Sequence, residues 1–231
     1  MRTERKRMDG IGSWGRGALA VAALLILAGP AMAGPPLICH AIDIGTAQSL
    51  PWSSSGWNLT GNETYDTANL VADTLKLLAP NTSVLVRMES IRRATLYAQH
   101  RNGIAAELLA KLAGRAKENP SDALAAFDYG YLVETYKQAK WLGEHTNWLK
   151  SSPGWTSAEL GAAENVDGTA LVEKAIALRG EDAEMEFAAA LMTREGADAE
   201  RTRHIKSALA GAKRDPLLAR NLASRFPRDA A

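Results

Sequence analysis

The 231-residue sequence contains a single cysteine, Cys39, so the chain cannot form a disulfide within itself. This excludes the small secreted domains that are held together by several disulfides. An excess of one charge is missing too, because 27 Lys and Arg residues are balanced by 26 Asp and Glu residues. A nucleic-acid-binding surface needs clustered basic residues, so this balance argues against a nucleic-acid partner.

Recognisable catalytic motifs are also missing beyond residue 33. The sequence there has no Gly-rich phosphate loop, no Gly-x-Ser-x-Gly turn and no Cys-x-x-Cys-His haem attachment site. Each of these motifs sets a reactive or cofactor-binding group at a fixed spacing. We therefore expect no cofactor and favour a non-enzymatic function.

Long apolar runs are absent apart from one short segment near the start, residues 18–28. It follows a basic stretch and precedes Gly29-Pro30 and the small-x-small pattern Ala31-Met32-Ala33. A membrane-spanning helix needs roughly 20 apolar residues, about twice this length. We predict a cleaved secretory signal at residues 1–33, no stable membrane span, and export to the bacterial periplasm or the extracellular space.

Residues 34–64 differ from the rest of the chain in being rich in proline and glycine. Proline removes a backbone donor, and glycine costs about 1 kcal/mol inside a helix, so a helix is not expected here. The segment is also apolar, and we predict an extended arm that docks on the body of the protein. Its docking side chains would be Ile38, Ile42, Ile44, Trp52 and Trp57.

From residue 65 onward, apolar residues recur at spacings of three and four, which is the period of an α-helix. Capping and breaking residues divide this region into predicted helices at 65–78, 83–101, 104–117, 121–142, 169–178, 182–194, 198–213 and 216–225. Between the fourth and fifth of them, the breaker Ser151-Ser152-Pro153-Gly154 indicates a linker over 148–168. We therefore predict an all-α fold, with a helical domain at 65–231.

The junctions between these helices resemble one another. Residues 177–184 can be laid over 212–219 at an offset of 35, and in both a basic turn is followed by a new helix. This pattern resembles the tetratricopeptide repeat, a helical hairpin of about 34 residues. The resemblance covers 171–226 and, more loosely, 83–139, although both stretches lack the Trp-Leu-Gly signature of the first helix. It implies antiparallel hairpins stacked in an α-solenoid, whose concave surface binds a peptide or partner protein.

Four polar residues lie on one face of the predicted helix at 83–101. Glu89, Arg93, Tyr97 and His100 follow one another at spacings of four, four and three. Side chains at these spacings share a helix face, and here they would line a groove that binds a polar or carboxylate ligand. The alternative is a solvated face with ordinary ion pairs.

Two other pairs contain residue types that bind metals. Cys39 and His40 are adjacent in the arm, and Glu200 and His204 are one helical turn apart. A zinc site usually needs three or four ligands, so both pairs are incomplete as they stand. Cys39 can instead be buried as a small apolar side chain, or it can join two chains in a homodimer.

These patterns lead to three functional hypotheses. The first is an exported helical-repeat adaptor or scaffold of the cell envelope that binds a protein or peptide. The second is a metal-dependent or enzymatic protein whose site combines Cys39 and His40 with the helix face of residues 89–100. The third is a structural envelope protein that dimerises through Cys39.

Overall fold

The computed structural model describes residues 34–53, 59, 61–145, 160–180, 182–193 and 197–230. The predicted secretory signal at residues 1–33 lies outside the described residues, as does Trp57 of the predicted arm. Most of the predicted linker lies outside them as well. Its described part, residues 160–168, buries Leu160 and Ala163 in the protein core, and its last residue, Gly168, already belongs to a helix.

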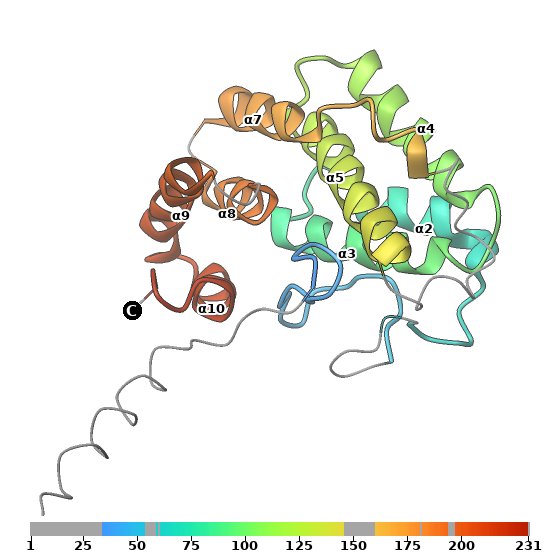
Figure 1. The fold of residues 1–231 in the computed structure, drawn as a ribbon, viewed down its shortest axis with the longest axis horizontal. Helices are drawn as coiled ribbons and strands as arrows, with labels where there is room; N and C mark the ends of the chain where they lie inside the picture. Colours follow the sequence, from blue (N-terminus) through green and yellow to red (C-terminus); the bar gives the residue numbers. More distant parts are fainter. Residues whose placement is uncertain are drawn as a thin grey trace, which may run out of the picture. The chain divides into compact units, whose positions relative to one another are not determined.

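Every regular element in the described part of the chain is a helix, which confirms the all-α fold class (Figure 1). The elements in chain order are the 3-10 helix η1 (Thr67–Asn69) and the α-helices α2 (Leu70–Leu77), α3 (Val84–Ala98), α4 (Ile104–Glu118), α5 (Ala123–His145), α7 (Gly168–Arg179), α8 (Ala183–Met192), α9 (Asp198–Ala212) and α10 (Pro216–Arg225).

Several of these helices begin where a capping side chain binds the free amide groups of the first turn. Asp122 accepts hydrogen bonds from two such amides at the start of α5, at 2.9 and 3.1 Å. Asp182 does the same for α8, and Asp215 for α10. An N-cap of this type contributes typically about 1 kcal/mol, so these aspartates set the helix starts locally.

Helix α3 is enclosed by the rest of the protein and packs against α2, α4, α5 and α8. Of its 15 residues, Arg93 alone is not buried. The buried residues include Arg87, Glu89 and Arg92, although charged side chains are rarely buried unless they are paired. The polar residues of α3 must therefore find partners inside the protein.

Residues 34–53 contain no helix or strand and supply five buried apolar side chains to the core. These are Leu37, Ile38, Ile42, Ile44 and Leu50. Burying each such side chain contributes roughly 1.5–3 kcal/mol, which holds the segment against the helices. Side chains of α5 and α10 also bind its backbone, since Gln138 accepts a hydrogen bond from the Leu37 amide and Asn221 from the Asp43 amide.

Helices α5 and α7 approach each other closely at two glycines. A Cβ atom added to Gly130 would lie 2.6 Å from the Gly168 carbonyl oxygen, and one added to Gly168 would lie 2.5 Å from the Gly130 carbonyl oxygen. Real Cβ atoms essentially never come so close to another heavy atom. The lack of a side chain at both positions is therefore what allows these helices to touch.

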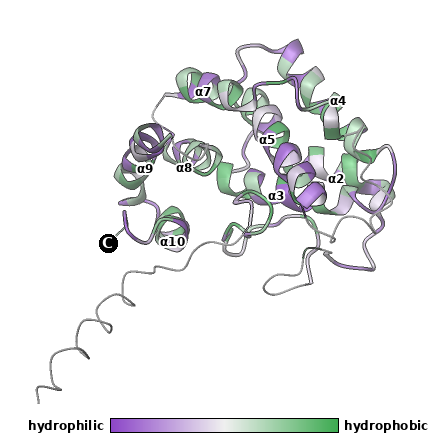
Figure 2. Ribbon diagram, viewed as in Figure 1, coloured by the Kyte–Doolittle hydropathy of each residue, from purple (hydrophilic) through white to green (hydrophobic). Residues whose placement is uncertain are grey.

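The C-terminal helices pack in succession, α7 on α8, α8 on α9 and α9 on α10. Helix α8 is almost entirely apolar apart from two glutamates, whereas the first half of α9 is mostly hydrophilic (Figure 2). This contrast fits the burial pattern, because α8 is buried at nearly every position and α9 mainly on one side. In the described part of the chain, no helix has both the length and the apolar character needed to cross a membrane.

Candidate functional site

The first candidate site is the polar face of α3, and its central residue is Glu89. The Glu89 carboxylate is completely buried and accepts hydrogen bonds from Arg92 Nε at 2.9 Å and Arg93 Nε at 2.7 Å. It also accepts one from the Ile42 amide at 2.9 Å. Two guanidinium groups and one backbone donor thus compensate for the loss of water around this charge.

Side chains close to Glu89 on α3 also bind main-chain atoms of residues that precede α2. Arg92 donates to the Ile38 carbonyl oxygen at 3.0 Å, and Arg93 donates to the Leu50 carbonyl oxygen at 2.7 Å. The Tyr97 hydroxyl donates to the Pro51 carbonyl oxygen and accepts a hydrogen bond from the Asn62 amide. The polar face of α3 therefore holds a part of the protein's own chain whose described residues contain no helix or strand.

The four predicted groove residues lie in two different settings. Glu89 and Arg93 contact residues 42–50, so their charges are used within the protein. Tyr97 and His100 line a cavity of about 420 Å³ together with residues of the segment 62–67. His100 is exposed, whereas Tyr97 is buried, and this burial raises the pKa of the Tyr97 hydroxyl.

A groove larger than the cavity at Tyr97 and His100 lies beside the polar face of α3. It was not predicted from the sequence. It has a volume of about 770 Å³ and is bounded by residues 47–51, the end of α2, the loop 79–83 and the start of α3. Lys76 and Gln48 are exposed at its wall. Because the walls come from separate parts of the chain, no single sequence pattern could reveal this groove.

Cys39 and His40 lie where residues 34–53 meet α3 and α10. Arg225 donates hydrogen bonds to the His40 carbonyl oxygen at 2.7 Å and to the Pro36 carbonyl oxygen at 3.2 Å. Cys39 is partly buried, and this burial raises the pKa of its thiol, although Arg92 and Arg225 oppose the shift. A raised pKa leaves less of the reactive thiolate form at neutral pH.

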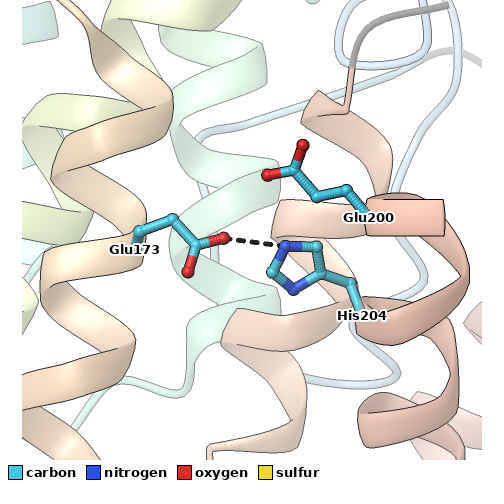
Figure 3. A group of neighbouring side chains, drawn as sticks. All are labelled: Glu173, Glu200 and His204. Atoms are coloured by element: carbon cyan, nitrogen blue, oxygen red, sulfur yellow. Dashed lines mark ion pairs between the residues drawn. The ribbon is translucent and has the colours of Figure 1, made fainter. Parts of the chain in front are cut away.

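The second candidate site joins α7, α8 and α9 around His204 (Figure 3). His204 is buried, and its Nε2 lies 2.7 Å from Glu173 Oε1 on α7. Its Nδ1 lies 2.6 Å from Glu186 Oε2 on α8. Glu200, one turn before His204 on α9, directs its carboxylate toward the same space. Sequence reasoning found the Glu200–His204 pair and missed the two glutamates that come from other helices.

Among the described residues, Glu173, Glu200 and His204 form the one group of three side chains that can hold a metal ion. Their ligand atoms all lie within 4.8 Å of one another. Cys39 and His40 do not belong to this group.

The aromatic residues of α5 are divided between core and surface. Tyr131 and Tyr136 are completely buried in the core, while Trp141 is 50% exposed and stacks on His145. Trp148 and Trp155 lie outside the described residues. The buried tyrosines therefore serve packing between helices.

The described chain is thus an all-α protein with two distinctive features. One is the buried helix α3 with its polar face, and the other is the cluster of one histidine and three glutamates in the C-terminal part of the chain. Comparison with protein-family models, with curated proteins and with solved structures found no match to this chain.

Proposed function

We propose that the protein is an exported adaptor of the cell envelope that binds an extended peptide segment of a partner protein. The observation that carries this proposal is the open groove of about 770 Å³ along residues 47–51. Ligand-binding clefts typically have volumes of about 300–1,000 Å³, so the groove is large enough to hold a short peptide.

The way α3 binds residues 38–51 and Asn62 supports a peptide rather than a small metabolite. Its side chains contact main-chain amides and carbonyls of that segment, which every polypeptide offers. Residues 49–51 thus line the groove next to the start of α3, and Arg93 of α3 holds the Leu50 carbonyl oxygen. A partner peptide in the groove would lie alongside a segment that α3 already holds in place.

The tetratricopeptide-like arrangement belongs to the same proposal. We propose that α7 to α10 stack as successive hairpins in the manner of that repeat. The consecutive packing of α7 on α8, α8 on α9 and α9 on α10 supports this arrangement. Export through a cleaved signal at residues 1–33 is likewise part of the proposal, and the basic and apolar pattern of that segment supports it.

A steric block of the groove tests the binding function. Peptides would be selected from a displayed random library on the immobilised full chain, and their affinities measured by calorimetry. Ala47 is exposed at the groove wall, and we expect Ala47→Trp to weaken the selected peptides by at least about tenfold, or 1.4 kcal/mol.

Ala106→Trp is the matched control, because Ala106 is an exposed alanine on the outer side of α4. It should leave the affinities unchanged. The proposal fails if no peptide is enriched over a blank surface, or if the Ala47 and Ala106 variants bind the selected peptides equally.

A further inference from the structure

The cluster around His204 contains a histidine whose ring is oriented by a carboxylate. His204 is 1% exposed, and its Nδ1 lies 2.6 Å from Glu186 Oε2. In the metal-binding form of the ring Nε2 carries no proton, so the proton lies on Nδ1, which donates it to the Glu186 carboxylate. Metal-binding histidines commonly donate their second ring N–H to a carboxylate in this way, and the other nitrogen then faces the metal.

The atoms on the other side of the ring have the spacing of a ligand set. His204 Nε2 and one oxygen each from Glu173 and Glu200 lie within 4.8 Å of one another. Ligand atoms of a tetrahedral zinc site, each about 2.0–2.2 Å from the ion, lie roughly 3.3–3.6 Å apart, so the carboxylates must move inward by up to about 1.5 Å. Glu200 is exposed and the Glu173 side chain is 34% exposed, which leaves both carboxylates room to rotate.

A positive group already lies against two of these three ligands. Arg203 Nη2 is 2.9 Å from His204 Nε2 and 3.2 Å from Glu173 Oε1. The site therefore attracts a cation, and the guanidinium competes for the place that a metal ion would take. Because the Arg203 side chain is 53% exposed, it can turn into solvent when a metal ion binds.

We propose that Glu173, Glu200 and His204 bind a divalent transition-metal ion, with Glu186 orienting the histidine. An imidazole nitrogen with two carboxylates suits zinc and its first-row neighbours, whereas magnesium and calcium favour ligands that are all oxygen. Three protein ligands leave at least one coordination position for water. This site is independent of the proposed peptide groove, and either proposal can fail without the other.

Zinc titration of the full chain tests the proposal, with Cys39→Ser as the background so that the thiol cannot contribute. We expect one zinc ion per chain by calorimetry. Glu200→Gln should abolish this binding, and Glu186→Gln should weaken it by about 10- to 100-fold, as is usual for a residue that orients a ligand. Arg203→Gln should strengthen binding several-fold, because it removes the competing cation.

Glu107→Gln is the matched control, since Glu107 is an exposed glutamate on α4 far along the chain from the cluster. Cobalt absorption bands in the visible range should appear for this control and not for Glu200→Gln. Because Glu200, Arg203 and Glu107 are all exposed, these variants are expected to fold. Absence of zinc binding to the Cys39→Ser chain, or equal binding by Glu200→Gln and Glu107→Gln, would overturn the proposal.

Discussion

Removing either partner of the buried Arg87–Asp128 pair is expected to destabilise the protein by about 3–5 kcal/mol. Replacing both partners together should cost less folding free energy than either single replacement. Arg87 Nη1 lies 2.6 Å from Asp128 Oδ2, and both side chains are fully buried. Asp128→Leu would leave the guanidinium without its counter-charge, and Arg87→Met would leave the carboxylate without its nearest one. A buried, unpaired charge is the costliest outcome of such substitutions.

The double variant Arg87→Met, Asp128→Leu should be more stable than the Asp128→Leu single variant. It removes the uncompensated charge, although the Thr82 carbonyl oxygen still loses the hydrogen bond from Arg87 Nε. Urea unfolding of the wild type, both single variants and the double variant gives a coupling energy, which we expect to reach about 2 kcal/mol or more. Single-variant costs that simply add would contradict this prediction.

The same pair produces a dependence of stability on pH. Burial raises the pKa of Asp128 to about 6 from its usual 3.8, even though Arg87 and Arg115 oppose the shift. Between these two values the folded chain holds a proton that the unfolded chain has released, so stability falls as the pH rises from about 4 to 6. The fall should approach about 3 kcal/mol and be absent from the double variant.

Glu89→Gln is expected to destabilise the protein by about 3 kcal/mol and to release residues 34–53 from α3. The substitution keeps the size of the side chain but leaves Arg92 and Arg93 without the carboxylate that each contacts at 3.1 Å or less. Urea unfolding would measure the change in free energy. Limited proteolysis should detect cleavage within residues 34–53 well before the helices are cut.

Glu107→Gln serves again as the control, because the change is the same and its side chain is exposed. Its cost should stay within about 0.5 kcal/mol, as for most surface substitutions. Equal resistance of the Glu89 and Glu107 variants to unfolding and proteolysis would show that the buried carboxylate does not hold the segment.

Helix positions were largely predictable because the deciding interactions are local. Asp122, Asp182 and Asp215 each bind amides two and three residues onward, and such caps can be recognised in the sequence. The predicted helix at 216–225 agrees with the observed α10 at both ends. The other predicted helices extend a few residues beyond the observed ones or fall short of them, as local signals allow.

The setting of Glu89 could not be predicted in the same way. Its spacing to Arg93 and Tyr97 places the three on one face of α3, but periodicity does not tell which part of the chain covers that face. The partner is Ile42, 47 residues earlier in the sequence. Burial of a charged helix face by such a distant segment depends on the tertiary fold, which local patterns do not contain.

The cluster at His204 shows the same limit. Glu200 and His204 are neighbours on one helix, so their spacing was visible in the sequence. Glu173 and Glu186 reach the imidazole from α7 and α8, and only helix packing brings them together. Of the cluster, sequence reasoning could therefore find only the two residues on α9.

Amide hydrogen exchange at Ile42 is the most direct test of the central claim that α3 binds residues 34–53 of its own chain. The Ile42 amide donates to the buried Glu89 carboxylate at 2.9 Å, although no helix or strand contains this residue. We predict slow exchange at Ile42 in the wild-type protein and fast exchange in Glu89→Gln, measured by nuclear magnetic resonance. Exchange in the wild type at the rate of an unstructured peptide would contradict the claim.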